Sequence, residues 1–285
     1  MPIAAGVYYF SHEAEERDKK RPPVILIHGA GGNHLSWPPQ IRRLTGERIY
    51  APDLPGHGKS EGAGRHSILE YAEDILAFMQ ELKIRAAVLA GISMGGAVSL
   101  HLVLKHPKKF HGLALFGSGA KLRVAQSILE TVGNPGTFES AVDMVNENCF
   151  SASAPQSLLQ LSKAQMMEIR PPVMLGDFLA CNEFDAASQL GQIKTPTMIV
   201  CGAEDKMTPL KYSEFLHNQI ANSRLHVVEN AGHMVMAEQP DAAADLLKQF
   251  IDSLPPRARK KKERVAPDGK TDPVQDAESA PADGS

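Results

Sequence analysis

The chain has 285 residues, of which 43% are hydrophobic and 22% charged, and its formal net charge is −3. This is the profile of an ordinary globular protein, and the small net charge gives no electrostatic reason to expect nucleic-acid or membrane partners. No apolar run approaches the roughly eighteen residues of a membrane helix, and the N-terminus does not have the pattern of a secretion signal. The three cysteines are scattered, which indicates buried thiols in a reducing compartment, so we expect a cytoplasmic protein.

The first half of the chain alternates short apolar runs with segments of helical periodicity. Strands are predicted at residues 7–10, 24–27, 48–51, 86–90 and 112–117, and helices from residue 36 to about 46, at 68–82 and at 94–105. Ser67 and Glu70 have the spacing of a capping box, so the second helix is expected to begin after Ser67. Strands and helices that alternate at this spacing predict a mostly parallel sheet with helices on both faces.

The alternation stops between residues 119 and 193, where the sequence has helical periodicity but no clear strand. This segment is too long for a simple crossover, so we expect a helical insertion. Strands at 197–201 and 225–228 and helices at 210–220 and 240–251 then complete the pattern. Residues 255–285 hold a basic run followed by an acidic, polar stretch without a large apolar residue. We expect this tail to be disordered, because it cannot bury a core.

A G-x-S-x-G sequence, Gly91-Ile-Ser-Met-Gly95, lies between the predicted strand at 86–90 and the helix at 94–105. A sharp strand-to-helix turn there would expose the Ser93 hydroxyl and aim the Met94 N–H from the first turn of the helix. Glycines at 91 and 95 suit the strain and close packing of such a turn. We therefore predict that Ser93 is a nucleophile; the alternative is an ordinary loop between a strand and a helix.

A serine nucleophile needs a base, and the base needs an acid that orients it. In an open parallel sheet, functional side chains follow the carboxyl ends of strands. Asp205 follows the strand at 197–201, and His233 follows the strand at 225–228. We therefore predict a triad of Ser93, His233 and Asp205, in the chain order serine, acid, histidine. Glu204, beside Asp205, is the rival acid.

These motifs together resemble the α/β-hydrolase superfamily, in particular its capped, lipase-like branch. The resemblance rests on His28-Gly-Ala-Gly-Gly32, Asp53-Leu-Pro-Gly-His-Gly-Lys-Ser60, Gly91-Ile-Ser-Met-Gly95, Gly202-Ala-Glu-Asp205 and Gly232-His233. It implies an α/β-hydrolase core at 1–118 and 194–254 and a lid at 119–193 over the active site. It also implies that the loop after His28 and Gly29 supplies a second oxyanion N–H from Ala30, with Gly31 in support. The N-terminal region has room for one strand where this family often has two.

The remaining candidates have structural or surface alternatives. His28 is expected to hold the glycine-rich loop by hydrogen bonds, and His57 to play a structural part in its turn. Lys121 and Arg123 lie at the entrance of the lid, either as contacts for an anionic substrate or as ordinary surface charges. Some apolar lid residues should line the pocket, while most pack the lid on the core. They are Met144, Phe150, Met166, Met167, Met174, Leu175, Phe178, Leu179 and Phe184.

The predicted function is hydrolysis of a small carboxylic ester or related acyl compound through an acyl-enzyme on Ser93, as in a carboxylesterase. No cofactor, metal, nucleic acid or membrane is expected to take part, and the oligomeric state does not follow from the sequence. Two alternatives stay open. The same triad serves carbon–carbon bond hydrolases of dienoates and enol-lactonases of aromatic degradation, and a member of the fold can also bind a ligand without turnover.

Overall fold

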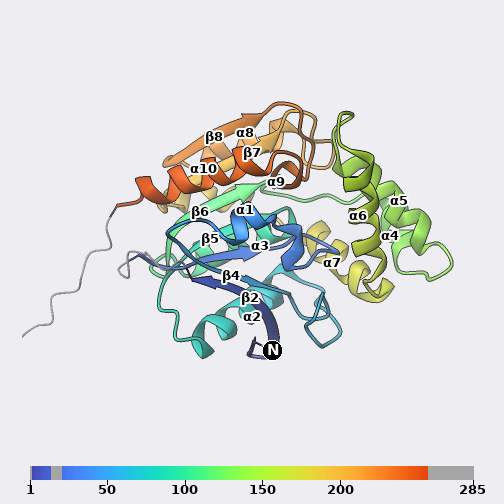
Figure 1. Cartoon of the computed structure of the whole chain (residues 1–285), viewed down its shortest axis with the longest axis horizontal. Coiled ribbons are helices and arrows are strands. Elements are labelled where there is room, and N and C mark those ends of the chain that lie inside the picture. Colours follow the sequence, from blue (N-terminus) through green and yellow to red (C-terminus); the bar gives the residue numbers. More distant parts are fainter. Residues whose placement is uncertain (1, 14–20, 256–285) are drawn as a thin grey trace, which may run out of the picture.

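The computed structural model describes residues 2–13 and 21–255, so the expectation for the tail from residue 256 onward lies outside the described residues. Eight strands form one sheet in the order β1-β2-β4-β3-β5-β6-β7-β8 (Figure 1). Their bounds are β1 Ile3–Ala4, β2 Val7–Glu13, β3 Val24–Ile27, β4 Arg48–Pro52, β5 Ala87–Ile92, β6 Phe110–Phe116, β7 Thr197–Gly202 and β8 Ser223–Val228. The six strands β3 to β8 run parallel to one another. Strands β1 and β2 are antiparallel additions at one edge. The predicted fold class is confirmed.

Two apolar clusters cover the two faces of the sheet. Alternate residues of β3 divide between them: Ile25 and Ile27 face one cluster, and Val24 and Leu26 face the other, as the twofold period of a strand requires. Helices α2, α3 and α8 contribute to the first cluster, and α1, α9 and α10 to the second. Because both faces of the central strands are buried, β3 and β5 are apolar throughout.

The helices that cover the sheet follow the predicted order. Their bounds are α1 Pro39–Arg42, α2 Ile68–Glu81, α3 Met94–Lys105, α8 Leu210–Gln219, α9 Val235–Glu238 and α10 Pro240–Ser253. Ser67 caps α2 as predicted, because its hydroxyl accepts the Glu70 N–H at 3.2 Å. The Glu70 carboxylate accepts from the Ser67 hydroxyl and from the N–H of His66, one residue before the cap.

Residues 119–193, between β6 and β7, form a helical segment that we call the cap. It contains α4 Gln126–Val132, α5 Phe138–Cys149, α6 Gln156–Met167, α7 Pro171–Glu183 and the 3-10 helix η2 Ala187–Gln192. In Figure 1, α4, α5 and α6 gather to the right of the sheet, while α7 lies between them and the body of the protein. A third apolar cluster, including Phe138, Val142 and Phe178, holds these helices together. Because α7 also packs against α3, it links the cap to the helix that follows Ser93.

Two local predictions are wrong, and one short helix was not predicted. The N-terminal region holds two strands, β1 and β2, joined by Ala5 and Gly6, which both have positive φ (50° and 75°). This is the geometry of a two-residue hairpin turn, and alanine is an unusual residue for it. The helix expected to continue to about residue 46 is a short 3-10 turn, η1 His34–Ser36, followed by the single turn of α1. The short helix α9 was not expected at all.

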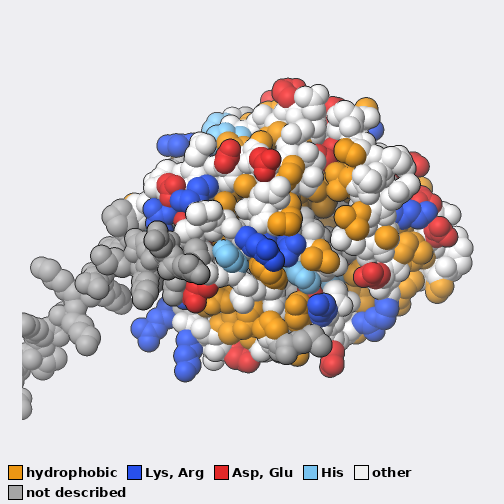
Figure 2. All heavy atoms as spheres, in the orientation of Figure 1, with side chains coloured by type: hydrophobic (Ala, Val, Ile, Leu, Met, Phe, Trp, Pro, Cys, Tyr) orange, Lys and Arg blue, Asp and Glu red, His pale blue; other side chains and the backbone are white. Residues whose placement is uncertain are grey.

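The charged side chains on the visible surface are of both signs. Figure 2 shows Lys and Arg side chains interspersed with Asp and Glu over the visible face, with apolar side chains between them. Among the residues that the structure describes, no helix is both long enough and apolar enough to cross a membrane.

Candidate active site

Ser93 occupies a strained turn between β5 and α3. Its backbone has φ 52° and ψ −116°, a combination that non-glycine residues rarely adopt. Its N–H donates to the Phe116 carbonyl at 3.0 Å, and its carbonyl accepts from the Ser118 hydroxyl at 3.0 Å, so the neighbouring strand β6 holds the turn in place. A Cβ on Gly95 would lie 2.2 Å from the Ile27 carbonyl oxygen. The close approach of helix to strand therefore requires glycine there, as the sequence predicts.

The structure brings His233 and Asp205 together. Nδ1 of His233 lies 3.0 Å from Oδ2 and 3.2 Å from Oδ1 of Asp205. Both side chains are buried. An imidazole that donates from Nδ1 to a carboxylate keeps Nε2 as its basic nitrogen. This is the tautomer that a general base for Ser93 needs.

Asp205 is held ionised and in place by several donors. Oδ1 accepts the N–H groups of Met207 at 2.9 Å and Thr208 at 2.8 Å, and Oδ2 accepts the Thr208 hydroxyl at 2.8 Å. Burial alone would raise the pKa of Asp205, but the attraction to His233 and the hydrogen bonds from His233 and Thr208 outweigh it and lower the pKa. Glu204 points elsewhere, because its carboxylate accepts the Ala152 N–H at 3.0 Å. The structure therefore places Asp205 next to the histidine, and not the rival acid.

The loop after β3 lies against Ser93. A Cβ on Gly29 would lie 3.3 Å from the Ser93 Cβ, so this part of the loop passes beside the nucleophile. His28, fully buried, donates from Nδ1 to the Gly29 carbonyl at 2.8 Å and accepts the Leu54 N–H at Nε2. His28 thus holds the loop by hydrogen bonds, as the sequence led us to expect. Ala30 follows in the loop, on the Ser93 side.

Ser93, His233 and Ala30 line one small cavity of about 60 Å³. Residues of the cap close it from the other side, and they include Met166 and Phe178 from the predicted apolar set and also Ser162, Gln165 and Cys149. Among the described residues that line this cavity, none is Asp, Glu, Lys or Arg, and burial raises the pKa of the Cys149 thiol to about 12. The cavity is therefore compact, mostly apolar and without an ion pair.

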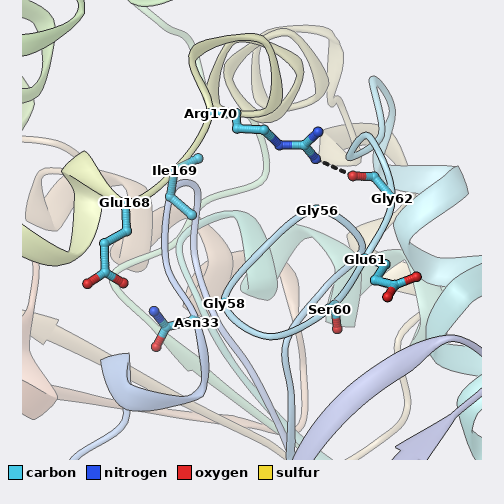
Figure 3. Close-up of a pocket in the computed structure, with 9 residues that line it drawn as sticks. All are labelled: Asn33, Gly56, Gly58, Ser60, Glu61, Gly62, Glu168, Ile169 and Arg170. Atoms are coloured by element: carbon cyan, nitrogen blue, oxygen red, sulfur yellow. Dashed lines mark hydrogen bonds between the residues drawn. The ribbon is translucent and has the colours of Figure 1, made fainter.

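Two larger hollows lie away from Ser93 and His233. One, about 390 Å³, separates the loop at 56–62 from residues 168–170 of the cap, and Figure 3 shows Arg170 bridging it to the Gly62 carbonyl. The other, about 370 Å³, is lined by Lys121 and Arg123 among others. Lys121 forms an ion pair with Asp185, and Arg123 donates to the Asn182 carbonyl. Lys121 and Arg123 therefore line a different hollow from the one that contains Ser93, which favours the alternative that they are ordinary surface charges.

Sequence reasoning missed Thr208 and Asp177. The Thr208 hydroxyl contacts both side chains: it donates to Oδ2 of Asp205 and lies 3.2 Å from Nδ1 of His233. Asp177 lies on α7 of the cap and accepts the N–H of Gly31, in the loop after β3. One sequence feature could have pointed to Asp177: it is a lone carboxylate within the otherwise apolar run from Val173 to Cys181. Such a carboxylate in a buried helix needs partners elsewhere in the fold.

The geometry and the comparisons with known proteins agree on the class of protein. The chain belongs to the alpha/beta hydrolase family, whose model matches residues 24–246. It is 29% identical over 263 residues to a pimeloyl-[acyl-carrier protein] methyl ester esterase of Neisseria meningitidis, covering 84% of this chain and 99% of that protein.

Two further similar proteins are an enol-lactonase and a second esterase. A 3-oxoadipate enol-lactonase of Acinetobacter baylyi is 25% identical, covering 82% of this chain and 90% of that protein. The solved structure of an esterase from Exiguobacterium antarcticum superposes with a TM-score of 0.78 at 24% identity, over 87% of this chain and 96% of that one. This structural likeness supports the fold alone, while the sequence relatives place the chain among hydrolases.

Proposed function

We propose that this chain is a serine hydrolase that cleaves an uncharged carboxylic ester through Ser93, His233 and Asp205. The observation that carries the proposal is the buried hydrogen bond between Nδ1 of His233 and Asp205, in a site where His233 and Ser93 line the same cavity. The N–H groups of Met207 and Thr208 donate to Oδ1 of Asp205, so the carboxylate is held in a position where it can accept a hydrogen bond from the imidazole. A structural histidine would not need to share a cavity with a half-buried, strained serine.

The mechanism follows from these positions. Ser93 Oγ attacks the ester carbonyl carbon while Nε2 of His233 takes the hydroxyl proton, and Asp205 stabilises the imidazolium that forms. The N–H groups of Met94 and Ala30 bind the tetrahedral oxyanion. The first N–H groups of a helix have no acceptor within the helix, so that of Met94 is free for this role. The imidazolium returns the proton to the leaving alcohol, and water then hydrolyses the acyl-enzyme by the same steps.

The charge of the cavity supports an uncharged substrate. Dienoates and the enol-lactone of 3-oxoadipate are carboxylates, and burying a carboxylate without a cationic partner is costly. Among the described residues that line the cavity, none is Lys or Arg. This favours a neutral ester over the carbon–carbon bond hydrolase and enol-lactonase alternatives.

The size of the cavity supports a short acyl group. Its volume of about 60 Å³ is far below the roughly 300–1,000 Å³ of pockets that enclose a drug-sized ligand. We propose that the cap at 119–193 acts as a lid, and that longer acyl chains require it to move. Met166 and Phe178 of the cap then decide how much chain the site accepts, because they close the cavity opposite Ser93.

A panel of p-nitrophenyl esters from acetate to decanoate, run beside a neutral lactone and a dienoate, tests the proposal. We expect kcat/KM to be highest for the shortest acyl groups and the dienoate to be a poor substrate. Purified Ser93→Ala serves as the matched control for background hydrolysis. Wild-type turnover of the dienoate faster than of every ester would overturn the assignment of substrate class, and equal ester turnover by Ser93→Ala would overturn the mechanism.

A further inference from the structure

A buried polar cluster lies beside the loop at residues 28–32, which holds Ala30 and which we call the oxyanion loop, and the proposed mechanism does not use this cluster. At its centre is Asp177 on α7 of the cap, whose side chain is fully buried. Oδ2 of Asp177 accepts the Gly31 N–H at 2.8 Å and Nε2–H of His57 at 2.7 Å, and Oδ1 accepts the Tyr71 hydroxyl at 2.5 Å. One carboxylate therefore joins the cap to α2, to the loop after β4 and to the oxyanion loop.

The hydrogen bonds of His57 make it a cation in this cluster. Its Nδ1 faces the Pro55 carbonyl at 3.1 Å, and its Nε2 faces Asp177. Both partners accept, so both ring nitrogens carry a proton. Burial alone would lower the pKa of His57, but the attraction and hydrogen bond to Asp177 outweigh it and raise the pKa. Asp177 thus has a buried cationic partner at 2.7 Å, which holds its carboxyl group in place.

The two peptide groups around Ala30 are each held by a different side chain. The Gly29 carbonyl accepts from His28 and from the Gly32 N–H, so the N–H of Ala30, trans to that carbonyl, points the opposite way. Within the described part of the chain, the following peptide is held only by the hydrogen bond from the Gly31 N–H to Asp177. Gly31 has φ 64°, and a glycine in this region leaves it easily unless it is restrained. Without Asp177, the peptide after Ala30 is free to rotate.

We propose that Asp177 is a positioning residue for the oxyanion hole: through the Gly31 N–H it fixes the loop that presents the Ala30 N–H, so the hole is fully ordered only when the cap is seated. The inference rests on the proposed function, because it assumes that Ala30 binds the oxyanion. It assigns the cap a second part in catalysis besides enclosing the substrate. The ion pair with His57 and the hydrogen bond from Tyr71 hold the carboxylate at the correct position.

Asp177→Asn and Asp177→Ala test the proposal as a graded pair. Asparagine retains one oxygen for the Gly31 N–H, whereas alanine retains none. We expect kcat to fall by roughly 10-fold in Asp177→Asn and roughly 100-fold in Asp177→Ala, approaching the effect of losing one oxyanion donor. KM should stay within about twofold of wild type, because the interaction matters most in the transition state. Rates are normalised to sites titrated with a fluorophosphonate, so that misfolded protein does not count.

Affinity for two inhibitors separates positioning from a merely structural role. A trifluoromethyl ketone forms a tetrahedral adduct with Ser93 and needs the oxyanion hole, so its Ki should rise in parallel with the loss in kcat. A ground-state amide of the same chain length does not need the hole, and its Ki should not change. Arg170→Gln is the matched control, since it removes a cap contact to the Gly62 carbonyl without touching the oxyanion loop. Its kcat should equal that of wild type.

A second variant keeps the test decisive if both Asp177 variants fold poorly. Tyr71→Phe keeps the buried ring and removes only the hydroxyl, which donates to Oδ1 of Asp177 and accepts the Arg65 N–H. We expect a several-fold loss in kcat and a matching rise in Ki for the ketone. Wild-type kcat per titrated site in Asp177→Asn, or in Tyr71→Phe where the former does not fold, would overturn the proposal. Full activity of Ser93→Ala, measured alongside, would instead overturn the proposed function.

Discussion

His28 should make the folded protein sensitive to acid, and the structure indicates by how much. Its Nδ1 donates to the Gly29 carbonyl and its Nε2 accepts the Leu54 N–H, so the folded state holds it neutral. Burial, with the nearby charge of His57, lowers its pKa to about 4. The imidazole is ordinary in the unfolded chain, with a pKa near 6.5. Between these values the unfolded state binds a proton that the folded state does not, so stability falls as the pH falls.

The magnitude follows from the same two values. Lowering the pH from 7.5 to 4.5 should remove about 2.5 kcal/mol of the free energy of unfolding through His28 alone. His28→Gln removes this titration while its side-chain oxygen can still accept the Leu54 N–H. At pH 7.5 the variant should be less stable by about 1 kcal/mol, for the lost bond to Gly29.

Urea denaturation of wild type and His28→Gln at several pH values measures the effect. Other groups titrate equally in both proteins, so the difference between the two isolates His28. We expect that difference to shift by about 2.5 kcal/mol in favour of the variant at pH 4.5. Parallel stability curves for the two proteins would refute the neutral, hydrogen-bonded state of His28.

Four further changes have expected outcomes. Ser93→Ala should lower kcat by roughly 10⁴-fold or more, with a melting temperature close to wild type by calorimetry. Asp205→Asn should lower kcat by roughly 10⁴-fold, because Met207 and Thr208 keep the oxygen at Oδ1 and the amide then faces His233 as a donor; an intact rate would show that another group orients His233. Gly95→Ala should cost about 1–3 kcal/mol of stability in urea denaturation through overpacking, since its Cβ would lie 2.2 Å from a carbonyl oxygen of β3. Iodoacetamide at pH 7.5 should leave ester hydrolysis intact over an hour, because burial raises the pKa of Cys149, in the cavity wall, to about 12; rapid inactivation would show that this thiol is reactive.

Most of the sheet and the turn at Ser93 could be predicted from local patterns. The strands β3, β5, β6 and β7 are short apolar runs, because helices cover both of their faces, and α3 begins and ends at the predicted residues. The positions of Asp205 and His233 followed from the rule that functional side chains come after parallel strands. These features depend on a few neighbouring residues, so a single sequence is enough to predict them.

The features that sequence reasoning missed depend on long-range packing or on unusual turns. The hairpin of β1 and β2 turns on Ala5 and Gly6, and alanine gives no turn signal there. Gly31 and Asp177 are 146 residues apart in the sequence, and only the fold shows that they meet. The cavity wall likewise draws on Ser162 and Gln165 of α6, whose polar side chains gave no sign of a role before the cap was placed.

The most direct test of the central claim is intact-mass spectrometry after treatment with a fluorophosphonate. Wild type should gain the mass of one phosphonyl group, and peptide mapping should place it on Ser93. Ser93→Ala should gain none, and His233→Gln should react far more slowly, because the base is missing. Heat-unfolded wild type is the control for unspecific labelling. No label on folded wild type, or a label on a residue other than Ser93, would contradict the account.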